Sequence, residues 1–437
     1  MIACLINGRA SMTFQDSLFF AVPAFVLLIA IEYGASLYMK KNVYPSFEDV
    51  VSSLSSGLAN ITFAAIGFIF VLAPYNWFVE NYAIFHVPAD SWIAWVVVIL
   101  CKDFSAYWFH RWTHRVNSLW QLHLIHHSSE EYNLPVALRQ STNGFVNYAS
   151  VALIPAALIG IPFEMVAIIG FVHLFYQYWY HTRLIGDLGW LEYIIVTPQQ
   201  HSIHHSMNKE YIDTNFGAWF SIWDQMFGTF QLKIPGVEQV YGITHPVKTW
   251  NPIKIDYMLW AKMLRDTLHT KKWSDKLKIW YAPTNWRPED VKEKFPSERV
   301  GDVYRLEKYQ PKTSRALKVW SFLELNAATL LIMLYFLALP QLSVFHSYLF
   351  GGFALFNVWT YTTVMEGQKQ ALLPVARLVL FTCMITFANT PITHFEWLWF
   401  IDFVFVSFYA VGILSAWLFS FPEEASDEKQ TESVTTS

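Results

Sequence analysis

The chain has 437 residues and a formal net charge of −4, with 54% hydrophobic, 18% aromatic and only 15% charged residues. Soluble domains usually carry about 25% charged residues, so this composition argues against a soluble protein. Cys4, Cys101 and Cys383 are odd in number and far apart in the chain. We therefore expect neither a disulfide framework nor a thiolate metal site.

Apolar runs close to the ~20 residues that cross a bilayer recur along the chain. Trp and Tyr gather near many of their ends, as interfacial anchors do. The pattern predicts an all-α integral membrane protein, a multi-span helical bundle. In chain order, the predicted membrane helices are 18–38, 59–75 with a backward extension from Ser52, 92–110, 145–161, 164–181, 319–339, 342–364, 371–388 and 397–419.

The distribution of charge predicts the domains and the orientation. Segment 246–318 holds 17 of the 30 Lys and Arg residues, and the positive-inside rule places such a segment in the cytoplasm. Counting the predicted membrane crossings from this segment puts the histidine-rich helix ends and the C-terminus in the cytoplasm as well. The predicted segments are an N-terminal span and linker (1–50), a histidine-rich domain (51–245), the basic cytoplasmic segment (246–318), a four-span membrane domain (319–420) and a disordered acidic tail (421–437).

Histidines cluster at the ends of the predicted membrane helices. Ten of the 15 lie between positions 110 and 205, and eight of these have i, i+4 or i, i+3, i+4 spacings that place side chains on one helix face. One such histidine alone would be a satisfied core residue. Nine in spaced groups would repel if protonated, whereas a metal holds them neutral and together. The predicted ligands are His110, His114, His123, His126, His127, His181, His201, His204 and His205.

The number of histidines suggests two metal ions, because four ligands already satisfy a structural zinc. The zinc-protease motif HExxH is missing, since "HRWTH" has Arg111 where its Glu would stand. Imidazole suits iron, copper and zinc alike, so spacing alone does not choose the metal, although a redox role favours iron.

Polar residues near these histidines are candidates to support the metal centre. Asp103 lies seven residues before His110, on the same helix face, and could accept a ring N–H. Gln177 lies four residues before His181, and His173 lies eight before it. Asn215 follows the last histidine group and could hold a metal-bound water. Alternatively, these residues are ordinary polar residues at helix ends or in turns, with no role in metal binding.

At these residues the chain resembles the fatty acid hydroxylase/sterol desaturase superfamily. The shared pattern is "HRWTH", "HLIHH", the isolated histidine of "YHT" and "HSIHH", with the contexts "TPQQHSIHH" and "NFGAWFSIWDQMFGTF". The resemblance covers roughly residues 50–235. It implies a bundle of membrane helices under a cytoplasmic cap that holds a di-iron site, and O₂-dependent hydroxylation or desaturation of lipids.

Three further stretches resemble the alkylglycerol monooxygenase family within that superfamily: "HHSSEEYNLPVALRQS", "FYQYWYHT" and "YGITHPVKTWNPIK". This resemblance implies hydroxylation of the carbon next to the ether oxygen of an alkylglycerol, which yields a fatty aldehyde and a glycerol derivative. It also implies O₂, tetrahydrobiopterin and two iron ions. One departure is Arg115, because a member of that family has an acidic residue directly after the second histidine of the first group.

The polar end of a lipid substrate needs partners near the metals. The candidates are Glu130, Glu131, Asn133, Arg139 and His245, each of which could equally belong to a solvated loop. An aromatic set in the cap, Trp219, Trp223, Phe227 and Trp250, could stack a pterin, although core packing is the commoner use. Electrons must come from outside, through a pterin with its recycling reductase or another donor. Nothing indicates a nucleic-acid partner.

Two rival functions stay open. One is a sterol, fatty acyl or aminolipid hydroxylase or desaturase of the same superfamily with a protein electron donor. The other is a membrane metal transporter or sensor, although transporters usually place ligands near the bilayer midplane. For the family function we expect the endoplasmic reticulum in a eukaryote and the inner membrane in a bacterium. Glu324 and Asp402 lie within C-terminal spans, where they could pair across helices, line a cavity or equally lie near the membrane interfaces.

Overall fold

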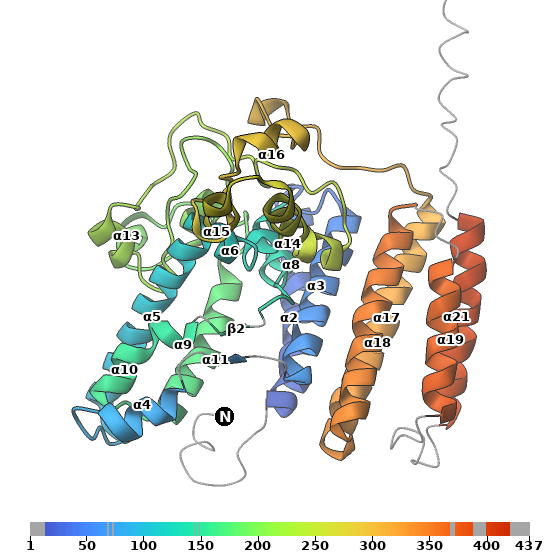
Figure 1. Cartoon of the computed structure of the whole chain (residues 1–437), viewed down its shortest axis with the longest axis horizontal. Coiled ribbons are helices and arrows are strands. Elements are labelled where there is room, and N and C mark those ends of the chain that lie inside the picture. Colours follow the sequence, from blue (N-terminus) through green and yellow to red (C-terminus); the bar gives the residue numbers. More distant parts are fainter. Residues whose placement is uncertain are drawn as a thin grey trace, which may run out of the picture. The chain divides into compact units, whose positions relative to one another are not determined.

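The computed structural model describes residues 14–67, 70–71, 74–144, 146–147, 149–367, 372–387 and 399–419 (Figure 1). Its α-helices are α2 (Phe14–Tyr38), α3 (Phe47–Ile66), α4 (Tyr75–Tyr82), α5 (Trp92–Arg115), α6 (Asn117–Trp120), α7 (Leu124–His127), α8 (Leu134–Ala137), α9 (Ala149–Ala152), α10 (Ile154–Ile159), α11 (Phe163–Trp179), α12 (Pro198–His204), α13 (Ile222–Phe227), α14 (Pro252–His269), α15 (Trp273–Tyr281), α16 (Glu289–Lys294), α17 (Arg315–Ala338), α18 (Val344–Met365), α19 (Leu372–Phe387) and α21 (Trp399–Phe419). Short 3₁₀ turns are η1 (Gly189–Tyr193), η2 (Val303–Arg305) and η3 (Leu339–Gln341). The strands β1 (Phe70–Val71) and β2 (Val146–Asn147) form a parallel pair.

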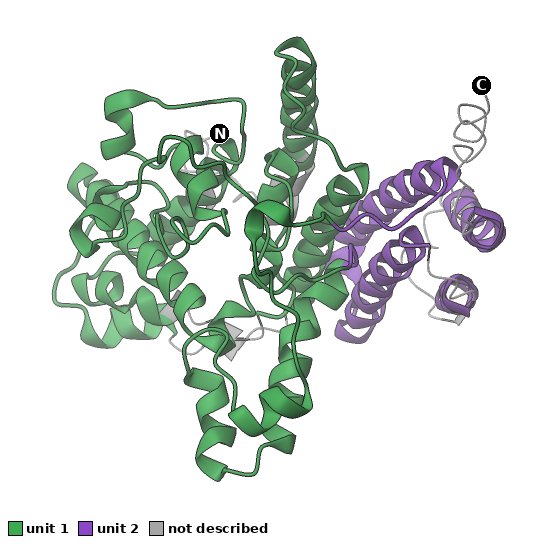
Figure 2. Cartoon of the chain, turned by 90° about the horizontal axis from the view of Figure 1, so that it is seen from above, with its two compact units in different colours: residues 1–248, 252–308 green, residues 249–251, 309–437 purple. Residues whose placement is uncertain are grey.

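The chain divides into two compact units (Figure 2). Unit 1 comprises residues 1–248 and 252–308, and unit 2 comprises residues 249–251 and 309–437. This division is coarser than the five predicted segments, whose boundaries stay predictions. The tail 421–437 and Cys4 lie outside the described residues, and Cys101 and Cys383 are free thiols.

Five helices in the described part of the chain are long and apolar enough to cross a membrane: 20–38, 47–66, 92–115, 315–341 and 400–419. The predicted all-α fold is confirmed for the described residues, apart from the two-residue strands, and a multi-pass membrane protein is supported. The predicted spans 164–181 and 342–364 are helical as α11 and α18. The side of the membrane on which each end lies stays a prediction.

Two predicted spans were wrong. The second span lies earlier than 59–75, because α3 ends at a left-handed Gly67 (φ 71°) that terminates the helix. The predicted helix 145–161 is broken into β2, α9 and α10, with Pro155 in the first turn of α10. Pro155 lacks the N–H that a continuous helix would donate to the carbonyl of Val151, four residues earlier, which is consistent with the break between α9 and α10.

Within unit 1, the helix that carries the first histidines is held by its cap and its packing. Ser91 caps the start of α5 by accepting a hydrogen bond from the backbone N–H of Ala94 (3.4 Å). Farther along, Val98 packs in an apolar cluster with Met165 and Ile169 of α11. This core fixes α5 against α11, so the last turn of α5 and the end of α11 deliver histidines to one place.

Candidate metal centre

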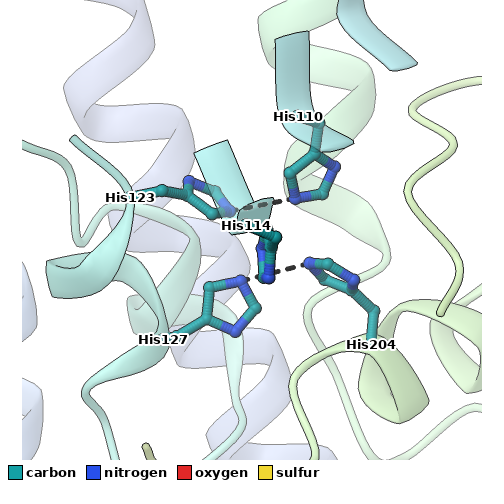
Figure 3. Close-up of side chains that lie close together, drawn as sticks. All are labelled: His110, His114, His123, His127 and His204. Carbon is teal, nitrogen blue, oxygen red and sulfur yellow. Dashed lines mark hydrogen bonds between the residues drawn. The ribbon is translucent and has the colours of Figure 1, made fainter. Parts of the chain in front are cut away.

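Nine histidine side chains of unit 1 converge in two groups. In each group one ring nitrogen per residue lies within 4.8 Å of the others. The first group is His110, His114, His123, His127 and His204, and the second is His126, His181, His201 and His205. Figure 3 shows the rings of the first group directed toward one another from α5, the start and end of α7, and α12.

The helical spacing divides each sequence motif between the two groups. His126 and His127 are neighbours in α7, yet they point into different groups. In the same way His204 joins the first group, while His201 and His205 join the second. The short helices α7 and α12 each contribute histidines to both groups. The two groups therefore form one structural unit.

Backbone carbonyl oxygens orient at least four of the rings. The Nδ1 atom of His126 lies 3.2 Å from the carbonyl O of Arg139, and that of His181 lies 2.8 Å from the carbonyl O of Gln177. Similar bonds join His110 to Phe216 (2.9 Å) and His204 to Thr214 (2.8 Å). Because a carbonyl oxygen only accepts, Nδ1 carries the proton in each ring, and a neutral ring then presents an unprotonated Nε2.

These tautomers leave lone pairs that face each other. The Nε2 atoms of His126 and His181 lie 3.3 Å apart, although both rings carry their proton on Nδ1. Two neutral rings in that state cannot hydrogen-bond to each other through Nε2. The Nε2 atom of His201 lies 3.0 Å from that of His181 and 3.1 Å from that of His205, so several nitrogens crowd a single point.

Burial makes a bridging proton a poor solution to this crowding. Desolvation, with the neighbouring imidazoles, lowers the pKa of His126 and His205 well below the usual range, and desolvation lowers the pKa of His181 to about 3. Buried ring nitrogens of His114 (Nε2) and His201 (Nδ1) also have no hydrogen-bond partner among the described residues. The donor set therefore fits metal cations that prefer neutral imidazole.

The loop after α12 positions two of the carbonyl oxygens. Asn215 adopts a left-handed backbone (φ 53°), and its side chain donates to the carbonyls of Gln200 (3.1 Å) and Gln231 (2.8 Å). Its neighbours on either side, Thr214 and Phe216, supply the carbonyls that orient His204 and His110. Asn215 thus fixes two ring orientations through the backbone, whereas sequence reasoning expected it to hold a water.

Asp103 also acts through this loop. Its carboxylate is fully buried and accepts hydrogen bonds from the backbone N–H of Trp219 (2.8 Å) and the indole N–H of Trp223 (2.8 Å). The ring of His110 is instead oriented by the carbonyl of Phe216. His173 lies 3.7 Å from Asp103 and falls outside both histidine groups.

The other predicted supporting residue contributes its backbone. Gln177 orients His181 with its carbonyl oxygen rather than with its side chain. Two partly buried members of the aromatic set pack against other rings: Phe227 stacks on Tyr107 with ring centroids 5.5 Å apart, and Trp219 stacks on His173 at 5.5 Å. Trp250 belongs to unit 2, so these four aromatic residues are not one cluster within a unit.

Two of the five predicted substrate-binding residues are buried and ion-paired with other parts of the protein. Arg139 is 1% exposed and donates to the carbonyl of Ile125 (3.0 Å) and to Asp49 (3.3 Å). Glu131 is buried and ion-paired with Lys308 (2.5 Å) and Arg183 (3.4 Å).

Three candidates remain. His245 lies 2.6 Å from the carbonyl O of Glu298 through its Nδ1. Glu130 is partly exposed and lies beside Gly242. Asn133 donates to the carbonyl of Val43 (2.9 Å), while its buried Oδ1 has no partner among the described residues.

Sequence reasoning missed Asp224, which holds the loop that orients His110. Its carboxylate accepts from the backbone N–H of Phe216 and Gly217, both at 2.7 Å. A Cβ at position 217 would lie 2.8 Å from Asp224 Oδ2, so this loop requires glycine there. The signal was the "NFGAWFSIWDQMFGTF" motif, which contains all three residues.

Aromatic rings that wall the centre were also missed. Trp120 lies against His114 (ring centroids 5.0 Å apart), and Tyr180 lies against His201 (4.3 Å). Tyr132 stacks on His181 at 5.7 Å, and its hydroxyl donates to the carbonyl of Tyr180 (2.9 Å). These rings cover the imidazoles with apolar surface and restrict the entry of water.

Fold and site together define a helical protein with several membrane-length helices and two adjoining histidine groups that could each hold a metal ion. Residues 95–229 match the family model described as fatty acid hydroxylase. The chain belongs to the fatty acid hydroxylase superfamily, within which it is similar to alkylglycerol monooxygenases. Members of this superfamily are iron-dependent oxygenases, and the chain is accordingly an oxidoreductase.

Three relatives show the extent of this similarity. The chain is 33% identical to an alkylglycerol monooxygenase of Homo sapiens over 70% of its own length and 67% of the relative. The enzyme of the same name from Xenopus tropicalis is 35% identical, with 63% of this chain and 61% of the relative matched. That from Danio rerio is 32% identical, with 65% and 61% matched. No solved structure gives a significant match.

Proposed function

We propose that the chain is a membrane monooxygenase that cleaves the ether bond of alkylglycerol lipids with O₂ and tetrahydrobiopterin. One oxygen atom enters the C–H bond next to the ether oxygen. Two electrons and two protons reduce the other atom to water, and the pterin supplies the electrons. The resulting hemiacetal collapses to a fatty aldehyde and a free glycerol hydroxyl. The named relatives support the substrate and the reaction class.

The observation that carries the proposal is the set of opposed Nε2 lone pairs, best seen at His126 and His181. We assign one iron ion to each histidine group, nine histidine ligands in all. Bound iron would supply activation of O₂ and removal of the hydrogen atom. A purely histidine set leaves both ions highly charged, so carboxylates nearby or a bound anion should offset that charge.

Other residues of the chain orient the imidazole rings and hold the loop around them in place. The carbonyls of Arg139, Gln177, Thr214 and Phe216 fix the ring tautomers, and such outer contacts tune metal affinity. Asp103, Asn215 and Asp224 hold the loop that carries two of these carbonyls. Among the candidates for the glycerol end of the lipid, we favour Asn133, because its Oδ1 can still accept a hydrogen bond from a hydroxyl.

The direct test is aldehyde release from an alkylglycerol by membranes that contain the protein, with and without tetrahydrobiopterin. We expect pterin-dependent aldehyde, and its loss in His126→Ala. The variant His86→Ala is a matched control, because His86 is exposed and lies outside both histidine groups. Iron-loaded protein that releases no aldehyde from any alkylglycerol would overturn the substrate assignment. It would favour another lipid hydroxylase of this superfamily, with a protein electron donor.

A further inference from the structure

The α14–α15 hairpin (residues 252–281) of unit 1 exposes the apolar face of each of its helices. In α15 the exposed large side chains are Trp273, Leu277 and Tyr281, at i, i+4 and i+8, and Trp273 is 80% exposed. In α14 Leu264 and Leu268 are also i and i+4, and Leu268 is 68% exposed. A helix face exposed to water normally carries polar side chains. We therefore expect an apolar partner to cover these residues.

The opposite faces of the hairpin are already committed to unit 1. Ile255 and Asp256 of α14 are buried, and the Asp256 carboxylate accepts hydrogen bonds from Thr142. Ile279 of α15 is buried, and its carbonyl accepts from Asn117 (3.1 Å). The exposed apolar face is therefore not a core face that a small rotation of the helices would bury.

Charge and orientation identify what covers this face. Residues 252–281 contain seven Lys and Arg against three Asp, a formal net charge of +4, and the exposed Lys271 and Lys272 lie in the turn between the helices. Figure 1 views α14 and α15 nearly end-on, whereas α2, α3 and α5 of the same unit run lengthwise in the picture. The hairpin thus lies across the direction of the candidate spans, near the ends of those helices.

We propose that the α14–α15 hairpin lies on the membrane surface, with Leu264, Leu268, Trp273, Leu277 and Tyr281 in the boundary between headgroups and acyl chains. A basic helix with Trp and Leu on one face lies in that plane, with the apolar face roughly 5–10 Å into the boundary. The lysines then meet anionic headgroups. The occupant of the face is the lipid leaflet, not a second protein.

This contact has a mechanical consequence for the metal centre. Directly after the hairpin, the hydroxyl of Thr284 donates to the carbonyl of His114 (2.6 Å), and the backbone N–H of Thr284 donates to that of Arg115 (3.3 Å). The end of α5 is thereby tied to a segment that rests on lipid. Seating the hairpin holds the first histidine group at a fixed depth relative to the leaflet that supplies an apolar substrate.

The test uses the full chain in nanodiscs that hold one copy each, with Cys4, Cys101 and Cys383 replaced by alanine. A fluorescent label is placed at Leu277→Cys on the apolar face or at Glu293→Cys on α16, which is exposed and polar. Lipids brominated in their acyl chains quench fluorophores that they touch. We expect strong quenching at position 277 and little at position 293. Equal quenching at the two positions would overturn the proposal.

Two further measurements keep the test independent of folding. A label at position 277 that is shielded from aqueous iodide, yet not quenched by brominated lipid, would mean that protein covers the face, and would also overturn the proposal. With the label kept at 277, Leu268→Glu should lose most of the lipid quenching. Lys292→Gln makes the same change in charge on α16 and should retain it. Quenching that survives Leu268→Glu would contradict seating through the apolar face.

Discussion

In unit 2 the carboxylate of Glu324 and the guanidinium of Arg377 pair through two N–O contacts of 2.8 Å, whereas the nine clustered rings of unit 1 are all imidazoles. The pair joins α17 to α19 and is completed by the indole N–H of Trp320 (3.0 Å) and by Asn357 (3.1 Å). Opposite charges cancel there without help. The imidazoles present lone pairs to lone pairs and need a cation from outside.

The surroundings of the two clusters show the same difference. Around Arg377 the helices are shaped to the pair: its guanidinium lies over the ring of Tyr409 at 4.5 Å, and a Cβ at Gly412 would lie 2.8 Å from Nη2. Around the histidines the backbone supplies only acceptors, which turn the rings inward. We infer that the Glu324–Arg377 pair stabilises the helix bundle of unit 2. The nine histidines of unit 1 are instead arranged to bind metal.

The largest expected effect comes from breaking the charge pair. Arg377→Met leaves Glu324 buried without its partner, which should destabilise unit 2 by about 3–5 kcal/mol. The double variant Glu324→Gln/Arg377→Met removes both charges and should recover most of that stability. Thermal unfolding of the purified protein in detergent measures both. A double variant no more stable than Arg377→Met would mean that the pair is not the reason for the loss.

Removing the metal should be the next largest perturbation, and it should act on the histidine cluster. Chelation of iron-loaded protein should lower the stability of unit 1 by about 1.4 kcal/mol for each of the two iron sites, or about 2.8 kcal/mol together, if free iron was at ~10 times its dissociation constant. Adding Fe(II) should restore it. The variant His126→Ala/His181→Ala removes two opposed rings and should respond less to the chelator. Equal responses in the two proteins would argue against the histidine centre as the site of binding.

A smaller effect is expected from loosening the loop that orients the rings. Asn215→Ala removes the side-chain bonds that place the carbonyls of Thr214 and Phe216. Outer contacts of this kind typically affect metal affinity by about 10–100-fold, and iron retained per chain after dialysis measures the loss. Asn215→Gly keeps a residue that tolerates φ 53°. If Asn215→Gly retains as much iron as the parent protein, then the left-handed backbone conformation, rather than the side-chain hydrogen bonds, supports iron binding.

The clustered histidines could be predicted from the sequence, but their arrangement in space could not. Eight of the nine were identifiable because helical spacing is visible in one dimension, whereas the isolated His181 was identified because it ends an apolar run just before the last group. Their division into two groups was not, because neighbours such as His126 and His127 diverge only once α7 is packed. The supporting residues failed for a related reason: Gln177 acts through its carbonyl, which every residue has. Likewise, Pro155 and Gly67 broke two predicted spans whose composition was apolar throughout.

The smallest effect tests an ion pair at the edge of the histidine centre, and it completes the comparison with the buried pair. Arg115 directly follows His114, and it pairs with Asp213 at 3.4 Å while half exposed. Exposed pairs contribute about 0–1 kcal/mol, so Arg115→Gln should barely change the unfolding midpoint. Asp213 also lies 3.9 Å from His114 Nδ1. Without Arg115 its carboxylate is free to accept from that ring.

We therefore expect Arg115→Gln to retain iron as well as the parent protein, or better, and Asp213→Asn to retain slightly less. Iron content after mild dialysis, measured beside the unfolding midpoint, separates the two effects. A large loss of stability in Arg115→Gln would show that this surface pair is as consequential as the Glu324–Arg377 pair. Burial would then not be what distinguishes the two ion pairs.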